Sequence, residues 1–287
     1  MDATTIITQI FLPTSLAIIM FGMGLTLVIK DFSRLFTYPK EVIIGLFNQL
    51  VFLPLIGFLI ILLFDLKSSM AIGIMILSLC PGGPTSNLIT QVARGNIGLS
   101  VTLTALASLI TVFTIPIILS EAIAYFTGKT DIVIELPVVQ TMIQILVITV
   151  IPVSIGMVIR KKNEAFALRM ERPMRIASTV LFIIIFLLVM FANKDLILQA
   201  MKEVGFATLL LNLSTMGLGY ITAKVFGIKG KSQTSITIES GIQNGTLAFV
   251  IATTILNNVE MGLPTGAYSI WMFITGGILM WRLGGSK

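Results

Sequence analysis

Histidine is absent from this sequence, and cysteine occurs once, at Cys80. Without histidine the chain lacks the side chain that ordinarily titrates between pH 5 and 8, a His–Ser catalytic pair and any His-based metal site. A single cysteine excludes an intrachain disulfide. Charged residues make up only 11% of the 287 residues. No linker or low-complexity segment is long enough to separate soluble domains, so we expect one domain over residues 1–287.

Apolar residues dominate what is present. They account for 56% of the chain, and the mean hydropathy is +1.02. Runs of about twenty apolar residues recur along the sequence, which is the length that crosses a bilayer as a helix. The first nine residues carry no Lys or Arg, so they lack the basic start of a secretory signal. The sequence therefore predicts an all-α polytopic membrane protein embedded in the lipid bilayer, with no nucleic-acid partner.

The hydropathy pattern and the basic residues together predict a topology. We predict about nine transmembrane helices, over residues 10–29, 41–64, 69–94, 97–125, 136–159, 176–191, 203–226, 232–256 and 265–283. All Lys and Arg residues fall on one side of such a bundle, except Lys67, Lys129, Lys194 and Lys202. The positive-inside rule then places the C-terminus in the cytoplasm and the N-terminus outside. We expect a monomer in the inner (plasma) membrane.

Two of the predicted helices are interrupted by residues that do not continue a helix. Residues 80–87 read CPGGPTSN, and closely spaced prolines and glycines break the helical hydrogen-bond pattern. We expect this break to cover residues 81–87 and the helix to resume at Leu88. Residues 237–246 read TIESGIQNGT. Their glycines allow the helix to unwind, and we expect a break over residues 239–245.

The second break places Glu239 inside a membrane span. A carboxylate at that depth costs on the order of 3 kcal/mol and is by default the mark of a functional site. The alternative is a loop joining two short helices, with Glu239 at an interface. Each break is, however, followed by one more helix in its own half of the chain. Gly/Pro-interrupted spans at matching positions indicate an inverted-repeat secondary transporter.

The residues at the breaks suit an anion and a cation. If the broken helices cross near the bilayer midplane, half-helix N-termini near Asn87 and Asn244 carry partial positive charge toward an anionic substrate. Hard cations take oxygen ligands from side chains and from unwound backbone. Glu239 has neutral oxygen-bearing partners available at Gln49, Ser86, Asn87, Ser100, Thr104 and Gln243. Composition does not separate sodium from proton coupling, but one carboxylate among many neutral oxygens favours sodium.

Five motifs make the chain resemble the bile acid:sodium symporter family. They are MFGMGLTL at residues 20–27, CPGG with Ser86-Asn87, ARGN at 93–96, LSV at 99–101, and Ile238-Glu239 with Gly241 and Gln243-Asn244. They occur in the family's order across most of the chain. The resemblance implies a sodium-coupled symporter of an organic anion that works by alternating access.

The resemblance also implies an organisation and a set of ligands. Panel helices at about 10–29, 136–159 and 176–191 would move against core helices at about 41–125 and 203–283. Two sodium ions are implied. The matching motifs assign the first ion to Ser86, Asn87, Ser100, Thr104 and Glu239. They assign the second to Gln49, Glu239 and Gln243, with the backbone carbonyls of Ser240 and Ile242.

Departures from the family pattern concern the substrate. Pro84-Thr85 replaces a Thr-Ala pair common in bacterial relatives, and Met272-Phe273 replaces a frequent His-Asn pair. Together with Asn244, these are the positions that the resemblance places near substrate. The replacement of the two family pairs by more apolar residues puts transport of bile acids in doubt. The predicted sodium ligands are unchanged. We expect a small organic anion, such as a short hydroxy or keto acid.

Other functional classes fit less well. An intramembrane protease would need a His-containing pair, a pair of membrane-depth Asp residues or a membrane-depth Lys, and the predicted spans supply none of these. A channel could use one Glu per chain in an oligomeric ring, but the paired breaks favour a carrier. A proton-coupled carrier or a channel of the same fold is the alternative.

Overall fold

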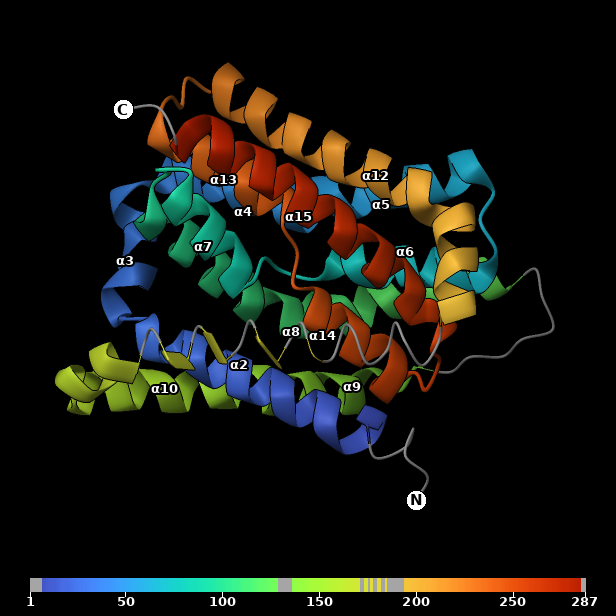
Figure 1. The fold of residues 1–287 in the computed structure, drawn as a ribbon, viewed down its shortest axis with the longest axis horizontal. Coiled ribbons are helices and arrows are strands. Elements are labelled where there is room, and N and C mark those ends of the chain that lie inside the picture. Colours follow the sequence, from blue (N-terminus) through green and yellow to red (C-terminus); the bar gives the residue numbers. More distant parts are fainter. Residues whose placement is uncertain are drawn as a thin grey trace.

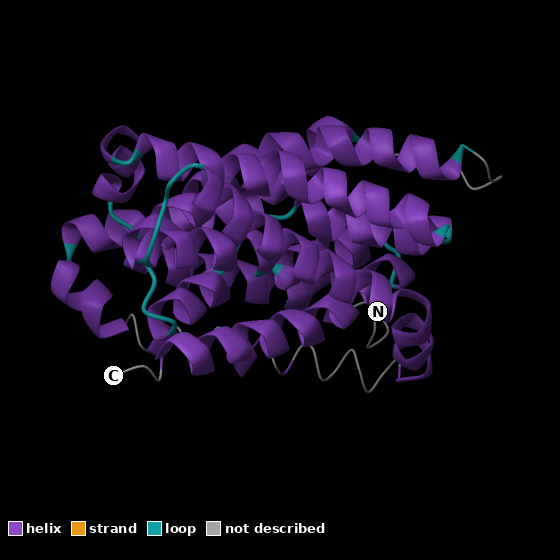
Figure 2. Ribbon diagram, turned by 90° about the horizontal axis from the view of Figure 1, so that it is seen from above, coloured by secondary structure: helices purple, strands orange, loops and turns teal. Residues whose placement is uncertain are grey.

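The computed structural model describes residues 7–128, 136–170 and 194–284, together with isolated positions between 173 and 184. Helices make up nearly all of this part of the chain (Figure 2). The described residues contain no β-strand, and a lone β-bridge joins Gly82 to Gln243. Six described spans are long and apolar enough to cross a membrane: Gln9–Thr26, Pro39–Phe64, Ile97–Thr127, Val138–Lys162, Met201–Val225 and Glu260–Gly284. The predicted all-α membrane class is confirmed.

The first half of the chain forms a series of helices that ends in the long helix α8. The elements are η1 (Ile7–Phe11), α2 (Leu12–Thr26), α3 (Ile29–Thr37), α4 (Pro39–Phe47), η2 (Asn48–Phe52), α5 (Leu53–Phe64), α6 (Ser68–Leu79), α7 (Pro84–Val92) and α8 (Ile97–Thr127). The π-helical segment η2 continues α4 into α5, so the span predicted at 41–64 is one continuous helical stretch.

The described residues of the second half also form long helices and contain one interruption near Gln243. Its described elements are α9 (Val138–Ile145), η3 (Leu146–Val150), α10 (Ile151–Lys162), α12 (Lys194–Val225), α13 (Lys231–Gly241), α14 (Gly245–Val250), η4 (Ile251–Ile255), η5 (Glu260–Gly262) and α15 (Leu263–Gly284). The helix predicted at 176–191 lies largely outside the described residues. The count of nine transmembrane helices therefore stays a prediction.

The structure corrects the prediction near the N-terminus. The first helix was predicted to reach Ile29, but α2 ends at Thr26, and Leu27 and Val28 are extended. The basic stretch after it was predicted to be a loop, yet it begins with helix α3. The cause is local capping, because the Asp31 carboxylate accepts a hydrogen bond from the Val28 amide at 2.9 Å. A carboxylate in a first helical turn also stabilises the helix dipole.

Helices α2 and α10 pack closely along one side of the molecule, while α12, α13 and α15 lie on the other side (Figure 1). Glycines allow the close packing. A Cβ built on Gly156 would lie 2.5 Å from the Phe21 carbonyl oxygen, and one built on Gly24 would overlap the Val153 backbone. Small residues at helix contacts allow such close approach of two membrane helices. The division into panel and core domains stays a prediction.

Both interruptions are shorter than predicted. Helix α7 already begins at Pro84, not at Leu88, because proline has no amide hydrogen to leave unpaired in a first turn. The second break leaves Glu239 inside α13, which continues to Gly241. Only Ile242, Gln243 and Asn244 are non-helical there.

Candidate cation site at the crossing of the two interrupted helices

The two interruptions lie directly against each other. Gly82, between α6 and α7, forms the β-bridge with Gln243, between α13 and α14. The amide of Asn244 donates a hydrogen bond to the Pro81 carbonyl at 2.8 Å. Figure 1 shows the two connections crossing near the centre of the bundle. Unwound backbone deep in a membrane protein is tolerated where it is paired within the protein or lines a site, and here each interruption pairs with the other.

The carboxylate of Glu239 lies beside this crossing and is buried, with 4% of the residue exposed. Ser100 donates a hydrogen bond to Oε1, and Thr104 donates to Oε2 at 2.9 Å. Both donors lie on α8, four residues apart, so they face the same side of that helix. Hydrogen bonds from hydroxyls stabilise a buried carboxylate, but no cationic side chain is paired with Glu239 among the described residues.

The start of α7 brings further oxygens to the same point. The Ser86 hydroxyl lies 3.5 Å from that of Thr104 and donates to the Gly83 carbonyl at 2.7 Å. The Asn87 amide oxygen lies 2.8 Å from the Ser100 hydroxyl oxygen. The side chains predicted for the first sodium ion therefore lie together at one position: Ser86, Asn87, Ser100, Thr104 and Glu239. Their role as sodium ligands stays a prediction.

Two residues of this cluster were missed by the sequence analysis. The Thr90 hydroxyl oxygen lies 3.3 Å from the Ser100 hydroxyl oxygen. Its position three residues after Asn87 on α7 was the available signal, because such residues share a helix face. Gly82 was treated only as a helix breaker. A Cβ built on it would lie 2.5 Å from Glu239 Oε2 and 3.2 Å from the Ser86 hydroxyl.

A pair of buried glutamines forms a second group of oxygens. Gln49 Nε2 donates to the Cys80 carbonyl and to Gln243 Oε1, both at 2.7 Å. Gln243 Nε2 donates to the Ser240 carbonyl at 3.2 Å. The Gln49 Oε1 atom is buried and has no hydrogen-bond partner among the described residues. A buried oxygen without a donor is unfavourable unless something positive pairs with it, so this atom is a candidate cation ligand.

The end of α13 is held by residues outside the predicted set. Asn212 Nδ2 and the Tyr268 hydroxyl both donate to the Gly241 carbonyl at 2.8 Å. The next residue, Ile242, has an extended backbone and donates its amide to Ile238 at 2.9 Å. Side chains from α12 and α15 thus satisfy the carbonyl exposed where the helix ends, as the hydrogen-bonding demand of a helix terminus requires.

Two other hydroxyls on α8 bond to the helix itself. Ser108 donates to the Thr104 carbonyl at 2.7 Å, and Thr111 donates to the Ser108 carbonyl at 3.2 Å. Both bonds return to the helix's own backbone, so these residues supply no free oxygen to the Glu239 cluster.

Comparison with known proteins decides the family. The model of the family described as "Sodium Bile acid symporter family" matches residues 13–200. The chain is 30% identical over 277 residues to the probable sodium/metabolite cotransporter BASS1, chloroplastic, of Arabidopsis thaliana, covering 95% of this chain and 67% of that protein. It is 30% identical over 266 residues to the uncharacterized sodium-dependent transporter YocS of Bacillus subtilis, covering 92% and 80%. It is 27% identical over 238 residues to the human ileal sodium/bile acid cotransporter, covering 82% and 67%.

The chain belongs to the sodium bile acid symporter family. This is a family of transporters, so the protein is a membrane transporter and not an enzyme. The resemblance that the sequence motifs indicated is confirmed. Among the described residues of this symporter-family chain, no three His, Cys, Asp or Glu side chains come together. The oxygen donors at the crossing are one carboxylate with neutral hydroxyls and amides.

A small cavity adjoins the Glu239 cluster in this symporter-family chain. It has a volume of about 190 Å³ and lies between α2, α7 and α8, with Pro84, Asn87 and Thr26 among its lining residues. Asn87 therefore borders both the cavity and the oxygens around Glu239. Two predicted substrate residues, Pro84 and Thr85, are half-buried at the start of α7. Of these two, only Pro84 lines the cavity.

The remaining predicted substrate residues lie elsewhere. Asn244 is buried, and its Oδ1 caps α14 by accepting the Leu247 amide at 3.0 Å. Met272 is 2% exposed in the main hydrophobic cluster, and Phe273 is 43% exposed. None of these three residues lines the cavity beside Asn87. The structure thus brings Pro84 to that cavity and leaves the assignments of Thr85, Asn244, Met272 and Phe273 as predictions.

Proposed function

We propose that this protein is a secondary active symporter that couples two sodium ions to the uptake of a small organic anion by alternating access. The observation that carries the proposal is the buried Glu239 carboxylate, which meets two hydroxyl donors where the interrupted helices cross. A buried carboxylate without a cationic partner is unfavourable. A bound monovalent cation supplies the missing positive charge, and the surrounding oxygens replace its water.

The donor set supports sodium as the ion. Sodium needs several oxygen ligands at once, as hard cations do, whereas a proton needs one base. Hydroxyl and amide oxygens from Ser86, Asn87, Ser100 and Thr104 surround the carboxylate and form the first proposed site. The names of the relatives describe sodium-dependent transport in bacteria, plants and mammals, which agrees with this ion.

The second proposed site lies on the other side of the crossing. Its ligands are the unpaired Gln49 oxygen, Gln243, and the carbonyls of Ser240 and Ile242, with Glu239 shared between the two ions. The bridge between Gly82 and Gln243 supports this arrangement, because Gly82 also lies against the Glu239 carboxylate. One carboxylate can thereby offset part of the charge of both ions.

The size of the cavity supports a small substrate. Pockets for drug-sized ligands span roughly 300–1,000 Å³, and the cavity beside Asn87 measures about 190 Å³. Helix α7 begins at its edge, so the first turn directs partial positive charge toward it. We assign the substrate as a short hydroxy or keto acid, held between α2 and the first turn of α7. The human relative is named for bile acids, which are much larger.

Alternating access follows from the proposed division of the chain. In this proposal α2, α9, α10 and the helix predicted at 176–191 form the panel, and the remaining helices form the core. The two halves of the chain are the two units of the inverted repeat, and each contributes one interrupted helix to the core. The glycine contact between α2 and α10 supports a panel that moves as a unit. We further propose a monomer in the plasma membrane with its C-terminus in the cytoplasm.

Sodium is expected to stabilise the purified protein more than potassium does. An ion that binds only the folded state at about 100 times its Kd stabilises that state by about 2.7 kcal/mol. Melting temperatures measured in NaCl and in KCl of equal concentration should therefore differ by several degrees, with sodium higher. Equal melting temperatures would contradict sodium sites, and a shift that depends on pH but not on the cation would favour proton coupling.

Removing one hydroxyl from the first site is expected to weaken sodium binding moderately. Thr104→Val keeps the shape of the side chain but deletes the group that donates to Glu239 at 2.9 Å. A hydrogen bond to a charged group contributes about 1.5–3 kcal/mol, so sodium affinity should fall by about tenfold or more. Radioactive-sodium binding measures this directly.

Thr111→Val is the matched control, because its hydroxyl donates only to the Ser108 carbonyl of the same helix at 3.2 Å. It is equally buried on α8, at 1% exposed compared with 0% for Thr104. We expect near-wild-type sodium affinity for this variant. Equal losses in the two variants would mean that Thr104 acts through general packing of α8.

A further inference from the structure

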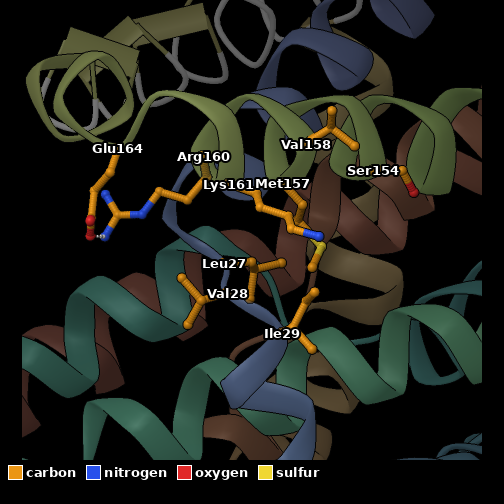
Figure 3. Close-up of a pocket in the computed structure, with 9 residues that line it drawn as sticks. All are labelled: Leu27, Val28, Ile29, Ser154, Met157, Val158, Arg160, Lys161 and Glu164. Carbon is orange, nitrogen blue, oxygen red and sulfur yellow. Dashed lines mark ion pairs between the residues drawn. The ribbon is translucent and has the colours of Figure 1, made fainter.

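A second and larger cavity lies away from the Glu239 cluster. It is formed by the connection between α2 and α3 and by the C-terminal end of α10. Its volume is about 560 Å³. Figure 3 shows its two walls: Leu27, Val28 and Ile29 form one, and the last turns of α10 with Glu164 form the other. No residue of the proposed sodium or substrate sites lines it.

Two adjacent cations border this cavity. In Figure 3 the Lys161 side chain extends over the cavity toward Met157, while the Arg160 guanidinium turns toward Glu164. Arg160 is largely buried, with 15% of its side chain exposed, and pairs with the 70%-exposed Glu164 at 3.3 Å. The buried Nε atom of Arg160 has no hydrogen-bond partner among the described residues. Glu164 thus pairs with the terminal nitrogen of Arg160, Lys161 extends away from that pair, and the buried Nε–H of Arg160 stays unused among the described residues.

The rim of the cavity is apolar and exposed. Ile29 is 66% exposed on α3, and Val158 is 51% exposed on α10. Further along α3, Phe36 is 84% exposed on the same short helix as Lys30 and Arg34. A helix that combines exposed apolar side chains with basic ones lies at the boundary between headgroups and acyl chains of a bilayer. This combination at the rim favours a position of the cavity at the level of the lipid headgroups.

We propose that this cavity binds the headgroup of an anionic phospholipid. Lys161, which extends over the cavity, binds the phosphate, and the guanidinium of Arg160, which also lines the cavity, adds a second positive charge at its edge. The acyl chains run outward over Ile29 and Val158. These apolar contacts favour a lipid over free phosphate, which would gain nothing from them. Basic pockets between membrane helices commonly recognise such headgroups.

Thermal stability of the purified full-length protein in detergent tests the proposal, with phosphatidylglycerol or the zwitterionic phosphatidylcholine added over a range of concentrations. We expect phosphatidylglycerol to raise the melting temperature in a saturable way and phosphatidylcholine to have little effect. Lys161→Gln removes an exposed charge without disturbing packing, and it should weaken the apparent affinity for phosphatidylglycerol about fivefold. Arg160→Gln should weaken it at least as much.

Two matched variants separate a built site from general attraction to basic charge. Lys162→Gln makes the same change one residue further along α10, at an exposed side chain that does not line the cavity, and should keep the wild-type affinity. Glu164→Gln removes the carboxylate that competes for Arg160 and should tighten binding. Equal losses at Lys161 and Lys162, or no gain from Glu164→Gln, would overturn the proposal.

An equal stabilisation by glycerol phosphate at the same concentration would identify a free-phosphate site instead and overturn the lipid assignment. The outcome is independent of transport, so it does not depend on the proposed function.

Discussion

Glu239→Ala is expected to abolish sodium-driven uptake while leaving a folded protein in the membrane. The substitution removes the charged group that meets Ser100 and Thr104 at the helix crossing. Leaving a buried charge without its partner costs about 3–5 kcal/mol. A sodium ion that lost this carboxylate should therefore bind at least about 100-fold more weakly. Because the proposed sites share Glu239, both ions should be affected together.

The fold should tolerate this change better than transport does. Deleting the carboxylate also removes the free energy needed to bury it, and the hydroxyls of Ser100 and Thr104 keep acceptors nearby at Thr90 and Ser86. Gel filtration and the melting temperature in KCl should remain close to those of the wild type. Loss of the folded protein would show that Glu239 is needed for stability, and its role would then have to be tested with Glu239→Gln.

Radioactive-sodium binding and uptake into proteoliposomes under a sodium gradient measure the effect. Glu121→Ala is the matched control, because Glu121 is an exposed carboxylate on α8 and should leave both measurements unchanged. Sodium binding by Glu239→Ala that persists near the wild-type affinity would contradict the assignment of both sites. Uptake that persists while responding to a pH gradient would indicate proton coupling through another group.

Gly82→Ala is expected to have an effect nearly as large, although it adds only a methyl group. The added Cβ would lie 2.5 Å from Glu239 Oε2 and 3.2 Å from the Ser86 hydroxyl. The first distance is shorter than any ordinary contact between a carbon and an oxygen, so the carboxylate or the crossing segment must move. The space that the methyl group takes is beside the oxygens proposed to hold sodium. We expect the sodium-specific thermal shift to disappear and uptake to fall by at least about tenfold, as displacements of about 1 Å at a site can do.

The next residue supplies the control for this prediction. A Cβ on Gly83 would lie 3.5 Å from the nearest atoms of Asn244, which is an ordinary van der Waals distance. Neither glycine has a positive φ angle, so alanine is compatible with the backbone at both positions. Gly83→Ala should keep the sodium-specific shift. If both variants keep it, the close approach of Gly82 to Glu239 has no bearing on sodium binding, and if both lose it, the crossing tolerates no side chain at all.

Several features of the protein followed from its sequence because they depend on local chemistry. Apolar runs of bilayer length predicted the membrane helices, since an unpaired backbone is unstable in lipid and a helix satisfies its own hydrogen bonds. Prolines and glycines at residues 81–84 predicted one interruption, and the glycines flanking Gln243 predicted the other. The motifs around Ser86, Ser100 and Glu239 were sufficient to indicate the family.

Local chemistry also led to the errors. The apolar run at residues 10–29 gave no sign that the helix ends at Thr26, because its end is set by the Asp31 cap and by the packing of α2 on α10. The break after residue 80 was predicted to be too long. Proline disrupts the interior of a helix, but it is favourable as the first residue of one, and α7 begins at Pro84.

Only the tertiary structure decided how these parts act together. Glu239 and Ser100 are 139 residues apart, and Gln49 and Gln243 are 194 apart, so no periodicity in the sequence relates them. The crossing of the two interrupted helices brings these residues together. It also places Gly82 against Glu239, where the absence of a side chain on Gly82 leaves room for the Glu239 carboxylate. The cavity beside α3 likewise lies between distant segments, α2 and α10, which pack closely through Gly24 and Gly156. Sequence determined which groups the protein carries, whereas contacts between distant segments decided which of them share one buried, poorly solvated space, where their electrostatic interactions are strongest.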